Sequence, residues 1–348
     1  MTAPLIIGWD VGGAHIKACL LEHDRITDLA QWPTPLWQGL AQLDAALELA
    51  FARWPQLAEA RHAVTMTAEM ADFFPDRQTG VRTLAHHLAA RLGPATRFYA
   101  GPAGWPQATD APQHWQAIAS ANWLATASLC ARRHPDAILL DIGSTTTDLI
   151  PVRHGQPTPI GHDDAARLAA GELVYLGVAR TPLCALARRI RCGDRSYNVM
   201  NEFFATSADV FRLTGELDPA HDHYPAADNA PKTAEATRRR LARMIGRDAH
   251  DAPPATWLAF AHRWRSLIRH EITRNLNRVT TPTRLPPHAP LIGAGAGLFL
   301  AQDIATQTAR PFIRFADIAG VPDTLESWAN VCAPAVAVAQ LLRRSESG

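Results

Sequence analysis

Apolar and polar positions alternate between short strand-like runs and longer helix-like runs along the chain. Near the amino terminus, residues 5–8 and 15–21 are apolar runs on either side of a glycine-containing turn, which predicts a β-hairpin. Apolar residues then recur at helical spacing over residues 36–53, until Trp54 and Pro55 end the run. Further strands are expected at residues 25–31, 62–66 and 97–100, and further helices at 81–92 and 113–133.

The opening pattern returns in the middle of the chain. A strand at residues 137–141 ends in Asp141, passes through glycine and hydroxyl residues and continues into a strand at 149–152. Asp10 and Asp141 hold the same place in their segments and lie 131 positions apart, so internal duplication is the simplest account. The later pattern predicts helices at residues 257–276, 298–306 and 325–342, with a strand at 290–292.

This repetition predicts two α/β domains, at the usual domain size of about 150 residues for a chain of 348. We expect the first over residues 1–135 and the second over 136–330. Residues 194–250 interrupt the α/β rhythm and are expected to form a helical insertion in the second domain. Residues 331–348 are expected to form a C-terminal helix that packs back on the first domain.

The first turn has the residues of a phosphate cradle. Gly12 and Gly13 leave backbone N–H groups open to an anion, and Lys17 adds a positive charge. Asp10, at the end of the strand, is suited to hold a hydrated divalent cation or to orient a nucleophile. The alternative for Asp10 is a carboxylate that caps the turn.

The second turn is richer in hydrogen-bonding groups. Gly143 precedes Ser144, Thr145 and Thr146, whose hydroxyls suit phosphate oxygens or the water shell of a metal, and Asp141 could complete a cation site. The alternative is a plain hairpin in which threonine serves strand propensity.

A third glycine-rich turn, Gly-Ala-Gly-Ala-Gly at residues 293–297, lies between an expected strand and an expected helix. A nucleotide or diphosphate could lie against its backbone, with Gly293 and Gly295 in contact. Neither a dinucleotide fingerprint nor a P-loop accompanies it.

Composition narrows the partners. The net charge is +1, and no long basic run occurs, which argues against nucleic acid. No apolar run approaches the ~18 residues of a membrane span, and no signal-like segment precedes the first strand, so we expect a cytoplasmic protein away from the membrane. Five cysteines without a C-x-x-C pair indicate reduced thiols. Among 34 basic residues only Lys17 and Lys232 are lysines.

The three turns, in this order, resemble the phosphate-1, phosphate-2 and adenosine motifs of the actin, sugar kinase and Hsp70 superfamily. Within it the chain resembles the hydantoinase/oxoprolinase-like branch, and more narrowly the tetrahydromethanopterin-linked one-carbon transfer pathway proteins, whose archaeal relatives are aryl ether synthases of methylofuran biosynthesis. The narrower resemblance rests on segments along nearly the whole chain, at residues 8–17, 66–72, 80–81, 141–149, 175–177, 180–182, 201–206 and 240–248.

The resemblance implies two duplicated RNase H-like domains around a central cleft. It also implies a transferase that joins the phenol oxygen of tyramine or a tyrosine-type compound to an aminomethylfuran methylene and releases diphosphate, in the one-carbon metabolism of methylotrophy. Its partners would be small-molecule substrates, a furan diphosphate and a phenolic amine or amino acid. The acceptor could be tyramine, its glutamyl conjugate or tyrosine.

The same resemblance assigns roles to the candidate residues. Catalysis would involve Asp10, Lys17, Glu69 and Asp72; a Mg²⁺ would bridge Asp10 and Asp141; and the diphosphate would lie against Gly12, Gly13, Gly143, Ser144, Thr145 and Thr146. Glu69 and Asp72 would bind an ammonium group or activate the phenol, and their alternative is a solvated helix start. Tyr175, Arg180, Asn201 and Glu202 are weaker pocket candidates. His221 and His223 have a spacing that permits metal ligation, against a solvated loop as the alternative.

Other functions stay open. The chain could be an ATP-dependent kinase or amide-cleaving enzyme with adenosine at Gly293 and Gly295, or a non-catalytic ATP-binding activator. Whether ATP binds, which group deprotonates the phenol and whether the chain forms a homo-oligomer are not fixed by the sequence.

Overall fold

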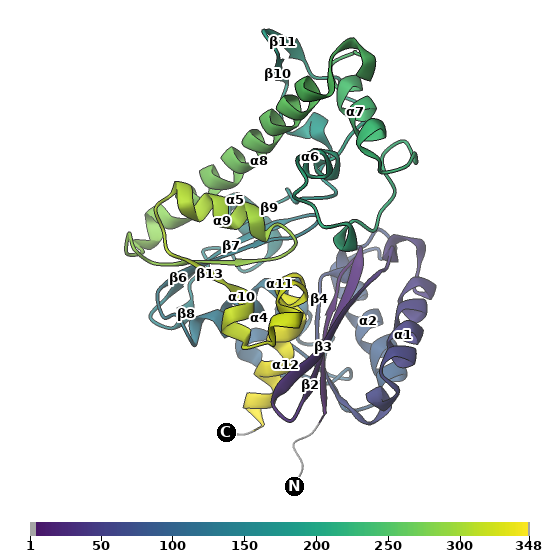
Figure 1. The fold of residues 1–348 in the computed structure, drawn as a ribbon. Coiled ribbons are helices and arrows are strands. Elements are labelled where there is room, and N and C mark those ends of the chain that lie inside the picture. The colour runs from purple at the N-terminus through teal and green to yellow at the C-terminus, as the bar shows by residue number, and fades with distance from the viewer. Residues whose placement is uncertain (1–4, 347–348) are drawn as a thin grey trace.

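The computed structural model describes residues 5–346, so the predicted outer limits at residues 1 and 348 lie outside the described part. Its first sheet has the order β3-β2-β1-β4-β5, in which β1, β2 and β3 are antiparallel neighbours and β4 and β5 run parallel to β1 (Figure 1). The strands of this sheet are β1 (Ile6–Val11), β2 (His15–Glu22), β3 (Arg25–Pro33), β4 (Arg61–Met66) and β5 (Thr96–Phe98). The helices of this half are α1 (Ala41–Arg53), α2 (Arg77–Leu92), α3 (Trp115–Ile118) and α4 (Asn122–Ala131).

The second sheet repeats this topology. Its order is β8-β7-β6-β12-β13, with β6, β7 and β8 antiparallel and β12 and β13 parallel to β6. A short sixth strand, β9, pairs with β7. The strands are β6 (Ala137–Ile142), β7 (Thr147–Arg153), β8 (Gln156–Pro157), β9 (Leu173–Val174), β12 (Leu291–Ala294) and β13 (Phe312–Arg314). The helices beside this sheet are α5 (Asp164–Ala170), α8 (Pro254–Thr283), α9 (Leu298–Gln307) and α10 (Phe315–Ala319). The expected α/β class is therefore confirmed.

Between β9 and α8 the chain leaves the sheet. It forms the hairpin β10 (Arg189–Cys192) and β11 (Arg195–Asn198), then α6 (Ser207–Thr214) and α7 (Ala234–Arg243). Residue 194, the expected start of the insertion, lies in the turn of that hairpin. Figure 1 shows these elements above the second sheet, with the loop before α7 descending toward the first.

Two helices expected to be continuous are broken. The predicted helix at 113–133 divides into α3 and α4, because Ala119 forms a parallel bridge with Met66 at the end of β4 and Ser120 adopts a left-handed φ of 51°. The predicted closing helix divides into α11 (Glu326–Val331) and α12 (Ala333–Ser345), and the chain bends by 102° between residues 323–331 and 333–345. Pro334 lies in the first turn of α12, where its missing N–H is tolerated, whereas it would interrupt a continuous helix.

The apolar core has three parts. One lies on the outer side of each sheet, and the third lies between the two sheets, where α4, α10 and α12 contribute buried alanine, leucine and valine side chains. α12 contacts β1, β2, β4 and α4, so the C-terminal helix packs against the first sheet (Figure 1, yellow). Because this central core is shared by both sheets, it fixes the ends of β1 and β6 relative to each other.

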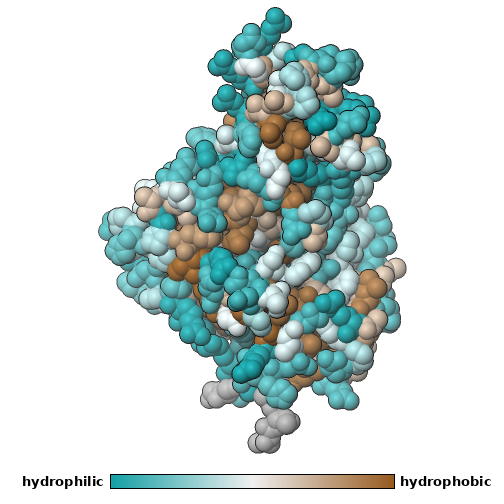
Figure 2. Space-filling model, in the orientation of Figure 1, coloured by the Kyte–Doolittle hydropathy of each residue, from teal (hydrophilic) through white to brown (hydrophobic). Residues whose placement is uncertain are grey.

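Polar residues cover most of the face shown in Figure 2, with apolar residues in separate patches. Within residues 5–346 no single helix is long and apolar enough to span a membrane, although the bent pair formed by residues 323–331 and 333–345 meets the criterion jointly by length and composition.

Candidate active site

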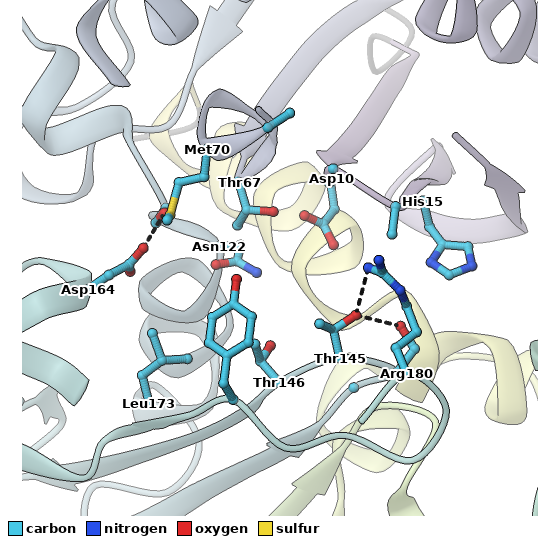
Figure 3. A pocket seen from close by; sticks show the side chains of 18 of the residues that line it. Asp10, His15, Thr67, Met70, Asn122, Thr145, Thr146, Asp164, Leu173 and Arg180 are labelled. Carbon is cyan, nitrogen blue, oxygen red and sulfur yellow. Dashed lines mark hydrogen bonds between the residues drawn. The ribbon is translucent and has the colours of Figure 1, made fainter. Parts of the chain in front are cut away.

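A cavity of about 570 Å³ lies where the ends of β1 and β6 face each other (Figure 3). Both glycine-containing turns open onto it. Both halves of the molecule form its walls, and they include the segments that follow β4 and β9. The lining residues are Asp10, Gly12, Gly13, Ala14, His15, Lys17, Trp37, Thr67, Met70, Ala71, Asp72, Ser120, Asn122, Gly143, Ser144, Thr145, Thr146, Asp148, Asp164, Arg167, Leu173, Tyr175 and Arg180.

The two glycines of the first turn differ. The backbone N–H of Gly12 donates to the carbonyl of His15 at 2.9 Å, and a Cβ at Gly12 would lie 2.8 Å from that oxygen. Gly12 is therefore required by the turn. A Cβ at Gly13 would meet nothing within 4 Å, so this residue presents open backbone to the cavity. Both glycines were expected from the sequence to contact an anion. The geometry favours Gly13 for that role.

Asp10 and Lys17 are cross-strand neighbours on β1 and β2, and this register brings their charged groups together. The Lys17 Nζ lies 3.6 Å from Asp10 Oδ2, whereas Asp10 Oδ1 is buried without a hydrogen-bond partner among the described residues. Burial raises the pKa of Asp10, partly offset by Lys17. Burial opposes the charge on Lys17, but Asp10 and Asp141 outweigh it and raise its pKa. Lys17 is thus cationic, and one oxygen of Asp10 is free for a ligand.

The second turn is held from behind by the segment that follows β9. The N–H of Gly143 donates to the carbonyl of Thr146 at 2.8 Å and closes the turn. Gly177 lies so near that a Cβ would be 2.5 Å from Thr145 N, and Val178 N–H donates to Gly143 O at 3.0 Å. This backing leaves residues 143–146 facing the cavity.

Asp141 and Asp148 are register partners on β6 and β7, but they differ in position. Asp148 lines the cavity and accepts a hydrogen bond from the buried guanidinium of Arg167 at 2.6 Å. Asp141 is absent from the cavity wall and lies beside Gly295, where a Cβ would be 2.5 Å from Asp141 Oδ1. Burial raises the pKa of Asp141 to about 7, and the neighbouring carboxylate of Asp148 adds to the shift. The expected joint cation site of Asp10 and Asp141 is therefore represented on the cavity wall by Asp10 alone.

The third turn does not reach this cavity. A Cβ at Gly293 would lie 2.7 Å from the ring of Phe312, so Gly293 is required by packing. Gly295 has φ 84°, which favours glycine, and lines a separate hollow of about 290 Å³ together with His221 and Arg314. Of the two cofactor contacts expected in this third turn, Gly295 borders the smaller hollow and Gly293 borders neither cavity.

Glu69 and Asp72 are separated by burial although they are close in sequence. Glu69 is buried behind the cavity wall, and Ser120 Oγ donates to its Oε1 at 2.8 Å. Ser120 also accepts from Arg77 Nη2 at 2.9 Å, and Arg77 forms a close ion pair with Asp164 of the other half. Burial raises the pKa of Glu69 to about 7. Asp72 is exposed at the rim.

Several lining residues were not singled out from the sequence. Ser120 lies in the break between α3 and α4, Asn122 begins α4, Asp164 begins α5, and Trp37 follows β3. Single residues of these types carry no sequence signal, and the helix break at Ser120 depends on the tertiary bridge between Ala119 and Met66. Tyr175 and Arg180 also line the cavity.

The remaining weaker candidates lie outside the cavity. Asn201 and Glu202 are exposed away from it. His221 packs edge-on against Trp328, with ring centroids 4.8 Å apart. Within the described residues no group of three or more His, Cys, Asp and Glu side chains is arranged to hold a metal ion.

The fold and the cavity define an α/β protein with two topologically matching sheets and a polar cavity between their strand ends. A family model described as hydantoinase/oxoprolinase matches residues 61–345. The chain belongs to the hydantoinase/oxoprolinase family, and the expected membership is confirmed.

Two curated relatives carry the same name, (4-{4-[2-(gamma-L-glutamylamino)ethyl]phenoxymethyl}furan-2-yl)methanamine synthase. The Methanocaldococcus jannaschii protein is 25% identical over 341 residues, which are 98% of each chain. The Methanococcus vannielii protein is 28% identical over 145 residues, covering 42% of this chain and 65% of that protein. A solved structure of nucleotide-free acetone carboxylase covers 88% of this chain and 67% of its own, with a TM-score of 0.56 and 11% identity, which supports the fold alone.

Proposed function

We propose that this chain is a transferase of methylofuran biosynthesis. It joins the phenol oxygen of a tyramine- or tyrosine-type acceptor to the methylene of an aminomethylfuran diphosphate and releases diphosphate. The observation that carries the proposal is the pair of turns, residues 12–13 and 143–146, that open with Lys17 onto one cavity. The whole-length similarity to a synthase whose name describes a phenoxymethylfuran supplies the substrate class.

The reaction requires the protein mainly to neutralise the charge of the leaving group and to position the two substrates. The bond between the methylene carbon and the diphosphate oxygen breaks, and its electron pair leaves with the diphosphate. The phenol oxygen then bonds to the furan-stabilised carbon, and the phenol proton passes to water. Lys17, the Gly13 backbone and the hydroxyls of Ser144, Thr145 and Thr146 would neutralise the leaving charge, which is the larger contribution expected in such a site.

A magnesium ion fits the Asp10 end of the cavity. Asp10 Oδ1 is buried, lines the cavity and has no hydrogen-bond partner among the described residues, so an oxygen ligand is available. Mg²⁺ commonly takes one or two carboxylates and fills its other positions with phosphate oxygens and water. In the proposal Asp10 would hold the ion, and the ion would supply positive charge to the diphosphate. Asp141 contributes through its charge beside Lys17.

The opposite end of the cavity suits ammonium groups. Asp164 and Asp72 present carboxylates there, and Tyr175 and Leu173 provide apolar surface between them and the second turn. Both substrates carry a primary amine in the tyramine form, and an ammonium group in a cavity requires a carboxylate. In the proposal the diphosphate therefore points toward Asp10 and the amines toward Asp164. Glu69 reaches this end only through Ser120.

The architecture of the actin, sugar kinase and Hsp70 superfamily completes the proposal. The matching strand order and direction of the two sheets support duplicated RNase H-like halves, with a central cleft between them. The limits near residues 135 and 330 and the inserted segment around residues 194–250 are proposed on the same basis. The segment between β9 and α8 forms no strand of either sheet, which supports an insertion.

The test is to incubate the purified chain with aminomethylfuran diphosphate, a phenolic amine or amino acid and Mg²⁺, and to measure ether product and pyrophosphate. We expect both in equal amounts. A parallel incubation with ATP tests the alternatives, an ATP-dependent kinase or amide hydrolase and a non-catalytic ATP-binding activator. ATP turnover or tight ATP binding without any ether product would reject the transferase proposal.

A further inference from the structure

The side chain of Arg180 is enclosed by two aromatic rings at the mouth of the cavity. Its guanidinium carbon lies 5.3 Å from the ring centroid of Trp37 and 5.3 Å from that of Tyr224. These distances are within the range of cation–π attraction. Trp37 belongs to the first half, whereas Tyr224 belongs to the loop before α7. Three separate segments therefore meet around one charged group.

Arg180 is also attached to the second turn. Its Nη1 donates to Thr145 Oγ1 at 3.3 Å, and its backbone N–H donates to Ser144 O at 2.9 Å. In Figure 3 its side chain extends from the second half toward Asp10 and His15 of the first. The guanidinium therefore faces the same space as the turn hydroxyls.

Tyr224 in turn is attached to the first turn. Its hydroxyl donates to the carbonyl of Ala14, and its ring lies edge-on to His15 with centroids 5.1 Å apart. The neighbouring His223 hydrogen-bonds to Gln31 through its Nδ1 at 3.2 Å. The loop before α7 thus touches the first half beside the turn that carries Gly12 and Gly13.

We infer that Arg180 is the second cation that binds the diphosphate, and that Tyr224 and Trp37 are positioning residues that aim it. This inference rests on the proposed function. Lys17 is already paired with Asp10, so a diphosphate with several negative charges meets too little positive charge from Lys17 alone. A planar guanidinium binds phosphate oxygens through two parallel hydrogen bonds, which the ammonium of lysine cannot reproduce.

The loop before α7, part of the inserted segment, would help to orient Arg180. The rings of Trp37 and Tyr224 restrict the guanidinium before the ligand arrives, which lowers the entropy lost on binding. Because Tyr224 also holds Ala14, the loop before α7 joins both anion-binding turns. Removing the ring should weaken anion binding without removing any charge.

The test is calorimetric titration of inorganic pyrophosphate, with and without Mg²⁺, into the full chain. We expect Arg180→Ala to weaken pyrophosphate binding by about 10- to 100-fold, the usual effect of losing a hydrogen bond to a charged group. Arg180→Lys should fall in between. Tyr224→Ala should weaken binding by about 3- to 10-fold, and Tyr224→Phe, which keeps the ring, should recover most of it. Arg239→Ala, at an exposed position of α7, is the matched control and should bind as wild type.

Thermal unfolding of each variant separates folding from binding. Pyrophosphate binding of wild-type strength in folded Arg180→Ala would overturn the inference, and so would equal binding by Arg180→Lys and wild type if Arg180→Ala does not fold. The ether-forming assay separates the two proposals. A wild-type chain that forms ether while the Arg180 variants match it contradicts only the inference. A wild-type chain that neither forms ether nor binds pyrophosphate contradicts the proposed function itself.

Discussion

The two ends of the cavity each contain an arginine, but the arginines differ in whether a carboxylate is paired with them. At the Asp10 end, Lys17 is paired with Asp10 and also lies near the charge of Asp141, whereas Arg180 forms no ion pair among the described residues. Asp10 Oδ1 and His15 Nε2 are buried there without hydrogen-bond partners among the same residues. At the Glu69 end, Arg77 pairs with Asp164 and donates to Ser120, and Ser120 donates to Glu69. Glu69 Oε2 and Arg77 Nε are also buried without partners among the described residues.

The difference indicates which end is prepared for an anion. Both ends contain buried polar atoms without partners among the described residues, so these atoms do not distinguish the ends. The arginines do, because an arginine without an ion pair gains more from a bound anion than one already paired with a carboxylate. At the Glu69 end, Arg77 is matched by Asp164, and the carboxyl groups of Asp72 and Glu69 add no positive charge, so this end offers no cation for an anion.

The largest effect is expected from Lys17→Ala. Removal of this cation should lower kcat/KM for ether formation by about 100-fold or more, as loss of a main charge stabiliser does. Arg239→Ala, an exposed cation of α7 outside the cavity, is the control, because the chain's other lysine, Lys232, pairs with Asp222 in the loop that carries Tyr224. Steady-state kinetics on both variants, with thermal unfolding as a folding check, measure the contrast. Wild-type kinetics for Lys17→Ala would remove the distinction between the two ends.

Asp10→Asn should act through the metal. The amide keeps the size of the side chain but loses the charge that attracts a divalent cation, so we expect the apparent affinity for Mg²⁺ to fall at least about 10-fold. A magnesium titration of ether formation measures this effect. Asp141→Asn provides the comparison, since Asp141 does not line the cavity, and should shift the titration less. An unchanged titration for Asp10→Asn would contradict the assignment of the ion to Asp10.

Glu69→Gln should alter stability with pH. The pKa of Glu69 is raised from 4.5 to about 7 in the folded chain, so between these values the folded state holds a proton that the unfolded state releases. Stability of the wild type therefore falls as pH rises through this window, by about 3 kcal/mol in total. Glutamine does not titrate, so the variant should gain on the wild type from pH 4.5 to 7. Denaturant unfolding gives the free energy of unfolding of the wild type and of Glu69→Gln at each pH. Parallel curves of this free energy against pH would contradict the prediction.

The sequence predicted the Asp10 end far better than the Glu69 end. The turns at Gly12–Gly13 and Gly143–Thr146 are local hairpins, so strand ends and turn residues stand together in the chain. Glu69, Ser120 and Asp164 come from three distant segments. The break in the helix at Ser120 depends on the bridge between Ala119 and Met66. Such contacts are set by tertiary packing, which overrides the helical pattern of residues 113–133.

Glycines required by packing differ in their surroundings from glycines that a ligand can approach. Gly293 is needed because Phe312 occupies the space of a side chain, and Gly12 because the turn does, whereas Gly13 is open to the cavity. In the sequence all three are glycines in glycine-rich turns. Only the surrounding atoms reveal which of them a ligand can approach.

The smallest effect is expected from Asp72→Asn. Asp72 is exposed at the rim, where water screens its charge, so loss of that charge should change KM for an amine-bearing substrate by no more than about threefold. Asp164→Asn is the sharper comparison, because Asp164 lines the same end and is the partner of Arg77. If Asp164→Asn raises KM for the amine substrate but not for an analogue lacking the amine, the Glu69 end recognises ammonium. If Asp72→Asn alone produces that pattern, recognition lies at the rim, and the buried network serves only to join the two halves.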